Sequence, residues 1–210
     1  MEINLKNIQA GFHQRLTLNR RIEVLSRELA KIIPDHASVL DVGAGSGEIA
    51  SRILQQRPDI TISGIDVVPR KDSAIPISYY DGLTIPYDNN SFDCVMCIDM
   101  LHHSDSIEHV LEEVKRVSKN VVVIKDHNCN SAIARKIISF TDGFANKPHG
   151  VPMTYNYLSR SQWLNLWDDL ELDCLSYSDS FGLYPFYSYF IFARDQDFIT
   201  LLKSANQDGR

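Results

Sequence analysis

Apolar residues follow two different periods along the first part of the chain. In residues 17–33, 49–56 and 104–118 they recur every three or four positions, which is typical of helices with one buried face. Between these segments lie short apolar runs with strand character, at residues 39–41, 61–65, 77–80, 91–98 and 121–124. This alternation predicts an α/β fold: one domain with a Rossmann-like, doubly wound and mostly parallel sheet.

The pattern changes after residue 131. Residues 132–144 and 161–169 again have helical spacing, the second with a serine cap, whereas 172–178 and 184–193 have strand character. The turn between these two strands is too short for a helical crossover, so we expect them to pair antiparallel. The sequence therefore predicts seven strands, with an antiparallel hairpin at the carboxyl-terminal end and a loose tail over residues 194–210.

The first strand leads into a glycine-rich turn that a helix follows. Residues 39–50 read VLDVGAGSGEIA, which places glycines at positions 43, 45 and 47. Such a turn leaves the backbone open to a ligand, and the helix start presents unpaired N–H groups to an anion. The dinucleotide fingerprint needs Gly-x-Gly-x-x-Gly, whereas here the third glycine comes one position early. The turn therefore indicates a nucleotide-type cofactor and disfavours a dinucleotide.

An aspartate stands at the end of each of the first five predicted strands: Asp41, Asp66, Asp81, Asp99 and Asp126. Because ligands bind beyond the carboxyl ends of parallel strands, these carboxylates would ring one crevice. Asp66 follows the glycine turn at the distance where an acidic side chain accepts the hydroxyls of an adenosine ribose. The next segment, residues 67–76, is too short for a crossover helix, so Asp66 has no helix to cap.

Four motifs follow one another between residues 41 and 117. They read Asp-x-Gly-x-Gly-x-Gly at 41–47, DGLTIPY with NSFD at 81–93, MLHH with a following aspartate at 100–105, and EVKRV at 113–117. This ordered set resembles the class I S-adenosylmethionine-dependent methyltransferases, in particular the quinone-biosynthesis-like branch with a type 11 methyltransferase domain. The resemblance covers residues 35–126. It departs from the family at 67–76, where members usually carry a helix.

The resemblance implies that the chain binds S-adenosylmethionine and releases S-adenosylhomocysteine. It also implies which residues contact each part of the cofactor. At the amino-acid end, Asp41 would bind the ammonium group, the backbone of Gly43, Ala44 and Gly45 would contact the rest of the methionine part, and Ile98 and Asp99 would line the sulfonium end. At the adenosine end, Asp66 would bind the ribose hydroxyls, Val67 would lie against the adenine face, and Asp81 with the backbone of Gly82 and Leu83 would bind the adenine edge. Divided by these roles, the domain would comprise a helical cap (1–35), a cofactor-binding half (36–127), an acceptor-side half with the hairpin (128–193) and the tail.

The chemistry itself makes modest demands on the protein. Methyl transfer from a sulfonium is an in-line displacement, so the protein mainly aligns donor and acceptor. A general base helps when the acceptor is a hydroxyl or an acidic carbon. His127, with Asp126 beside it, lies just beyond the fifth strand and is the first candidate for this base; His103 is the second. The family pattern makes His102 and His103 look partly structural.

Cys94 and Cys97 have the spacing of a metal or redox pair, but they lie on a predicted strand. Positions three apart on a strand point to opposite faces, so both thiols cannot easily hold one metal. We expect both to be buried as small apolar side chains, and we identify no metal site.

Residues 146–157 show no periodicity although they lie within a compact domain. Long irregular segments of this kind often serve as lids. We expect this one to cover an acceptor pocket together with the amino-terminal helix; plain scaffolding is the alternative.

Composition and net charge limit the kinds of partner and the compartment that we expect for this protein. The net charge of −6 gives no overall attraction to nucleic acid, and four cysteines suit a reducing compartment. No apolar run approaches the ~20 residues of a membrane span. We therefore expect a cytoplasmic monomer or homodimer that methylates a small molecule at oxygen, carbon or nitrogen. The alternatives are a non-catalytic S-adenosylmethionine-binding partner protein and, less favoured, a nicotinamide-dependent oxidoreductase.

Overall fold

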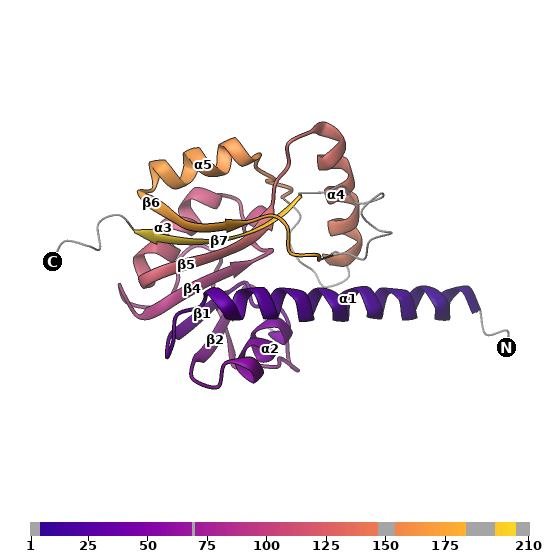
Figure 1. Cartoon of the computed structure of the whole chain (residues 1–210), viewed down its shortest axis with the longest axis horizontal. Coiled ribbons are helices and arrows are strands. Elements are labelled where there is room, and N and C mark those ends of the chain that lie inside the picture. The colour runs from indigo at the N-terminus through magenta and orange to yellow at the C-terminus, as the bar shows by residue number, and fades with distance from the viewer. Residues whose placement is uncertain (1–4, 69, 147–153, 184–195, 205–210) are drawn as a thin grey trace.

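A computed structural model describes residues 5–68, 70–146, 154–183 and 196–204. Within these residues a seven-stranded sheet runs through the molecule in the order β3-β2-β1-β4-β5-β7-β6 (Figure 1). The strands are β1 Ser38–Val42, β2 Thr61–Asp66, β3 Ile77–Tyr79, β4 Phe92–Ile98, β5 Ser118–His127, β6 Leu172–Ser178 and β7 Asp197–Ser204. Strands β1 to β5 pair parallel, and β7 is antiparallel to β5 and β6. The predicted fold class is confirmed.

Helices α1 and α2 cover one face of this sheet, and α3 and α5 cover the other. The helices are α1 Leu5–Ile32, α2 Glu48–Gln56, the 3₁₀ turn η1 Leu101–His103, α3 Ile107–Val117, α4 Ala132–Asn146 and α5 Arg160–Asp169. One core lies under α1 and α2 and includes Leu25 and Ile53; the other lies under α3 and α5 and includes Leu111 and Trp163. Helix α1 extends well past the sheet, on the same side as α4 (Figure 1). Among the described residues no helix is both long and apolar enough to cross a membrane.

The two cysteines of β4 belong to different cores of the protein. Cys94 belongs to the core under α1 and α2, whereas Cys97 belongs to the core under α3 and α5, and both are fully buried. The prediction that their thiols point to opposite faces is confirmed. Burial raises the pKa of Cys94 to about 12, with a smaller contribution from Asp93, so this thiol stays protonated and behaves as an apolar side chain.

The segment between β2 and β3 contains no helix in its described residues, as its length predicted. It packs against the glycine turn instead. The Ala74 N–H donates to the Ser46 carbonyl at 2.8 Å, and the Gly64 N–H donates to the Pro76 carbonyl at 2.9 Å. This short segment therefore supports the turn from the side where other folds of this type place a helix.

The carboxyl-terminal strand lies elsewhere than predicted. The expected hairpin strand at 184–193 falls outside the described residues, and the strand that pairs with β6 is β7, Asp197–Ser204. The predicted tail over 194–210 is therefore wrong for these residues. Strand β7 contributes Phe198 and Leu202 to one core and Ile199 to the other, so both of its faces are covered and its apolar residues do not alternate. This is why the period-two pattern failed to reveal it.

Helix starts follow local hydrogen-bonding groups. Helix α3 is capped by Ser106, whose side chain accepts from the His109 N–H, and not by Ser104 or Asp105 as the sequence suggested. The 3₁₀ turn η1 comes first and uses Ser104, whose hydroxyl donates to the Leu101 carbonyl at 2.6 Å. Helix α5 begins after Ser159, which forms a capping box with Gln162.

Replacing Phe198 by alanine should test whether β7 belongs to the core. Phe198 is fully buried, and its ring lies 5.3 Å from that of Trp163 and 5.6 Å from that of Tyr177. Phe198→Ala should lower the free energy of unfolding by about 3–5 kcal/mol. Urea denaturation measures the loss. Leu175→Ala, on the exposed side of β6, is the control, and a loss for Phe198→Ala no larger than the control's would contradict the burial of β7.

Candidate active site

Most of the predicted site residues meet at one edge of the sheet. Asp41 lies near the end of β1, Asp66 ends β2, and Asp99 directly follows β4. Because β7 runs antiparallel, its first residue, Asp197, lies at the same edge and pairs in register with His127, the last residue of β5. The carboxyl ends of the parallel strands thus collect acidic and basic side chains from segments far apart in sequence.

Side chains pack closely on the first and third glycines of the glycine turn, whereas the middle glycine faces open space. Gly43, Gly45 and Gly47 all have positive φ, at 73°, 59° and 71°. A Cβ on Gly43 would come within 2.6 Å of the Met100 side chain, and one on Gly47 within 2.7 Å of the Ile75 side chain. A Cβ on Gly45 would meet nothing within 4 Å. The turn therefore offers bare backbone to a ligand at Gly45, as a nucleoside cofactor requires.

Asp66 fastens this turn to β2. Its Oδ2 accepts from the Gly45 N–H at 2.8 Å, and its Oδ1 accepts from the Val68 N–H at 2.7 Å. A carboxylate has lone pairs for about four hydrogen bonds, so these two leave room for ribose hydroxyls. The structure thus gives Asp66 a structural role that the sequence did not predict, and this role is compatible with the predicted one.

The residues predicted for the adenine lie together beyond β3. The Asp81 carboxylate accepts from the N–H groups of Leu83 and Thr84, both at 2.8 Å, and these bonds lower the pKa of Asp81. Gly82 has φ of 82°, and a Cβ there would lie 3.1 Å from Val67. The Leu83 side chain is 58% exposed. Val67 and Leu83 therefore offer apolar surface beside an anionic hydrogen-bond acceptor, which fits an adenine ring.

Asp41 is a buried carboxyl group, with 3% of its surface exposed. Burial, reinforced by the charge of Asp66, raises the pKa of Asp41 to about 8. A cationic ligand group at this position would favour the charged carboxylate and lower the pKa again. The ammonium group of a methionine part supplies such a cation.

The end of β5 directs charged side chains to both faces of the sheet. Lys125 and His127 point toward the α1 face, where the fully buried Lys125 ammonium pairs with Asp99 and with Asp197. His127 lies between the same two carboxylates, with Nδ1 3.2 Å from Asp197 and Nε2 3.6 Å from Asp99. Burial would raise the pKa of Asp197, but Lys125, His127 and Arg21 together outweigh burial and lower it.

Asp99, His127 and Asp197 could also be considered as metal ligands, because one ligand atom of each lies within 4.8 Å of the others. However, the Lys125 ammonium contacts both carboxylates. A cation of the protein itself thus already occupies the position between them, and the arrangement fits an ion-pair network.

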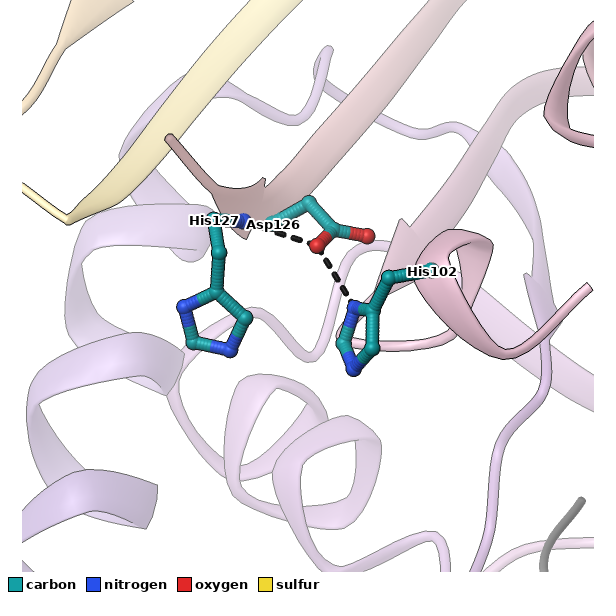
Figure 2. A group of neighbouring side chains, drawn as sticks. All are labelled: His102, Asp126 and His127. Atoms are coloured by element: carbon teal, nitrogen blue, oxygen red, sulfur yellow. Dashed lines mark hydrogen bonds and ion pairs between the residues drawn. The ribbon is translucent and has the colours of Figure 1, made fainter. Parts of the chain in front are cut away.

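Asp126 points to the other face and binds His102 (Figure 2). His102 Nδ1 lies 2.6 Å from Asp126 Oδ1, and both side chains are 1% exposed. The same oxygen accepts from the His127 backbone N–H at 2.7 Å. Burial would raise the pKa of Asp126, yet the neighbouring His102 lowers it, so the carboxylate is charged and holds the imidazole in place. Sequence reasoning expected His102 to be partly structural and missed this pair.

The three predicted catalytic residues are thus neighbours, but they pair differently than expected. Asp126 stands beside His127 in the sequence, but its side chain holds His102 (Figure 2). The His127 ring lies instead between Asp99 and Asp197. The half-buried His103 ring lies 4.2 Å from that of His102. The alternation of side chains along β5 could have placed Asp126 and His127 on opposite faces, but no sequence signal indicated His102 as the partner.

The described part of the predicted lid packs on His102. Thr154 Oγ1 donates to the His102 carbonyl at 2.8 Å, and the Asn156 N–H donates to the same oxygen at 3.1 Å. The Tyr157 ring stacks on the His102 imidazole at 5.1 Å. Tyr155 has φ of 55°, an uncommon conformation for a tyrosine. Residues 147–153 lie outside the described residues, so the lid itself stays a prediction.

Sheet order, glycine turn and strand-end carboxylates together define a Rossmann-like fold. The chain belongs to the methyltransferase domain family, whose family model matches residues 13–177. The predicted class is therefore confirmed, while the quinone-biosynthesis-like branch stays a prediction.

Individual proteins that resemble this chain in sequence or in fold are also named as methyltransferases. The chain is 28% identical over 129 residues to 27-O-demethylrifamycin SV methyltransferase of Amycolatopsis mediterranei, a match covering 53% of this chain and 47% of that protein. It is 34% identical over 70 residues to demethylmenaquinone methyltransferase of Deinococcus radiodurans, covering 28% and 29%. A chain from the complex of the Haloferax volcanii Trm112 methyltransferase activator with a methyltransferase has the same fold, with a TM-score of 0.66, 14% identity and coverage of 97% and 99%. This chain thus spans under half the length of the curated relatives it matches.

Asp41 should make the stability of the ligand-free protein depend on pH. Its folded pKa, about 8, lies above the ordinary value of 3.8, so its favourable contribution is complete below that ordinary value and is lost as pH rises through about 8. Asp41→Asn should therefore be stabilised relative to the wild type by a gap that widens from pH 4 to pH 8, reaching at least about 1 kcal/mol. Denaturation at several pH values measures this gap. The control is the exposed Asp72→Asn, and a gap that does not change with pH would refute the raised pKa.

Proposed function

We propose that this protein binds S-adenosylmethionine and transfers its methyl group to a small-molecule acceptor. The observation that carries the proposal is the glycine turn, in which Gly45 faces open space while its N–H bonds Asp66. The buried Asp41 carboxyl lies within electrostatic reach of Asp66 and suits a cationic ligand. Membership of the methyltransferase domain family supports the same cofactor.

Each part of the cofactor has residues of matching chemistry. Asp41 would bind the ammonium group, Asp66 the ribose hydroxyls and Asp81 the adenine edge. Their carboxylates stand at or near the ends of β1 and β2 and just beyond β3, in the order in which the sheet brings these ends together. The sulfonium end would lie toward Ile98 and Asp99, at the end of β4. When bound, the cofactor supplies an electrophilic methyl group on a positively charged sulfur.

We place the general base at His102, and this favours a hydroxyl acceptor. Asp126 accepts the Nδ1 proton, which makes Nε2 the basic nitrogen of the ring. His102 would take the proton of the acceptor hydroxyl, while the bound cofactor would supply the methyl group that the acceptor oxygen receives. Burial of this pair keeps bulk water away from the proton transfer. The name of the Amycolatopsis relative specifies methylation at an oxygen, which supports this acceptor class.

The same buried pair favours an enzyme over a non-catalytic cofactor-binding partner protein. A histidine and an aspartate that lose nearly all contact with water must be paired, and we propose that this pair serves proton transfer. The cytoplasmic compartment and the monomeric or homodimeric state stay predictions.

Removing the Asp66 carboxylate tests cofactor binding. Asp66→Ala should weaken S-adenosylmethionine binding at least about tenfold, because it removes the ribose acceptor and releases the Gly45 N–H. Isothermal titration calorimetry measures the affinity, with thermal unfolding as a check on the fold. Asp72→Ala removes an exposed carboxylate of the following segment and should bind like the wild type. If Asp66→Ala binds S-adenosylmethionine as tightly as the wild type, the assignment of Asp66 to the ribose hydroxyls is refuted.

Two histidine variants separate the rival bases. His102→Gln should lower kcat about 10²- to 10⁴-fold while leaving the affinity for S-adenosylmethionine within about twofold, because the loss concerns the proton alone. His127→Gln should lower kcat much less. Release of S-adenosylhomocysteine measures turnover with 27-O-demethylrifamycin SV and with demethylmenaquinone, the acceptors named by the two relatives. His109→Gln, an exposed histidine of α3, is the control. The reverse ranking of His102 and His127 would return the base to His127.

A further inference from the structure

Two charged residues of the EVKRV motif contact the segment that the proposed function assigns to the adenine. The motif occupies residues 113–117 at the end of α3, and its Glu113 and Arg116 side chains form hydrogen bonds with residues 81–90, which we call the adenine loop. These side-chain contacts join residues 27 to 31 positions apart in the sequence. The adenine loop and the EVKRV motif are thus two parts of one arrangement.

The adenine loop has little regular structure that could hold it in place. All of its residues are described, and none of them belongs to a helix or a strand. The Asp81 carboxylate bonds the N–H groups of Leu83 and Thr84, but both lie within the loop itself. The three-residue strand β3 attaches the start of the loop to the sheet. The position of Asp81 therefore depends on what holds the loop beyond Thr84.

Glu113 and Arg116 hold the loop through its backbone. Glu113 Oε2 accepts from the Ile85 N–H at 2.9 Å. The Arg116 guanidinium donates to the Ile85 carbonyl at 2.9 Å and to the Tyr87 carbonyl at 2.7 Å. At the end of the loop, the Asn90 N–H donates to the Arg116 carbonyl at 2.9 Å. Both backbone polar groups of Ile85 are thus bonded to this pair, immediately after the residues that the Asp81 carboxylate contacts.

Arg116 uses every donor that a guanidinium has. Its Nε and Nη2 donate to the two carboxylate oxygens of Glu113, both at 2.7 Å. Nη2 also donates to the Ile85 carbonyl, and Nη1 donates to the Tyr87 carbonyl and, at 3.1 Å, to Asn89 Oδ1. These contacts match the five N–H groups of a guanidinium, so Arg116 is suited to hold the loop and not to bind a ligand. A lysine could not reproduce the planar fork.

We propose that Glu113 and Arg116 are positioning residues that set the selectivity of the site for adenine. They keep the loop against α3, and the loop in turn holds the Asp81 carboxylate where it accepts from the exocyclic amino group of the base. The inference rests on the proposed cofactor. A purine with an exocyclic oxygen instead presents an acceptor to this carboxylate, so a fixed Asp81 rejects it, whereas a displaced Asp81 does so much less.

Two ligands that differ at the exocyclic group test the proposal. S-inosylhomocysteine keeps the ribose and the amino-acid end of S-adenosylhomocysteine but carries an oxygen in place of the amino group. Calorimetry should show that the wild type binds S-adenosylhomocysteine at least about tenfold more tightly than the inosine analogue. Arg116→Gln should bind S-adenosylhomocysteine at least about tenfold more weakly than the wild type and the analogue within about threefold, so the ratio of the two affinities should fall.

Lys115→Gln is the matched control. Lys115 precedes Arg116 on α3, and its side chain is exposed to a similar degree, 27% against 29%. Its ammonium donates to the Leu170 carbonyl, outside the adenine loop. Lys115→Gln removes one positive charge, as Arg116→Gln does, but it should keep the wild-type ratio. Arg116→Lys retains the charge without the planar fork, so its ratio should also fall.

Each other outcome has a distinct meaning. A wild-type ratio in both Arg116 variants would show that the pair only stabilises the fold, and this would overturn the proposal. A fall as large in Lys115→Gln, or equal binding of the two ligands by the wild type, would overturn it as well. If thermal unfolding shows that Arg116→Gln does not fold, Arg116→Lys decides. A wild type that binds neither ligand would refute the proposed cofactor itself, which separates the two failures.

Discussion

The candidate site depends on one buried lysine. The Lys125 ammonium has no access to water, and an ammonium in such a place is tolerated only when carboxylates pair it. Asp99 comes from the end of β4 and Asp197 from the start of β7, so one cation joins three neighbouring strands at their functional edge. Because Lys125 holds Asp197, β7 is fixed in one register against β5. Because Lys125 also holds Asp99, Arg21 on α1 has a defined partner at the edge of the sheet.

From Lys125 onward, successive side chains of β5 point to alternate faces of the sheet, so the two faces receive different charged groups. Lys125 and His127 point toward the face covered by α1, where they form an ion-pair network with the neighbouring aspartates. Asp126, between them, points to the opposite face and holds His102. A one-residue shift of β5 would exchange the two sets, so the register that Asp197 enforces also keeps the proposed base away from the ion pairs.

Local sequence was enough to predict the glycine turn and the carboxylates at the strand ends, but not the pairing of His102 with Asp126. The glycine turn, the carboxylates at the strand ends and the opposite faces of Cys94 and Cys97 follow from spacing within one or two elements. Strand β7 was not predicted because its apolar residues face both cores and do not alternate, and its polar first residue, Asp197, is stabilised by Lys125, 72 positions away. The pairing of His102 with Asp126 depends on how the 3₁₀ turn after β4 meets the end of β5, and no periodicity encodes such a meeting.

Helix α1 and strand β7, which are far apart in the sequence, meet at this edge through Arg21 and Asp197, and this has a consequence for how the site forms. Arg21 precedes the glycine turn, and Asp197 lies beyond the 13–177 segment that the family model matches. Contacts of such long sequence separation carry a large loop-closure cost and form late in folding. The glycine turn and its aspartates can therefore assemble within residues 38–81, whereas the ion-pair network that orients Asp99 requires α1, β5 and β7 to be in place. In the proposed cofactor site, the adenosine end thus belongs to a local unit, whereas Asp99, at the end of β4, belongs to an ion-pair network that spans the domain.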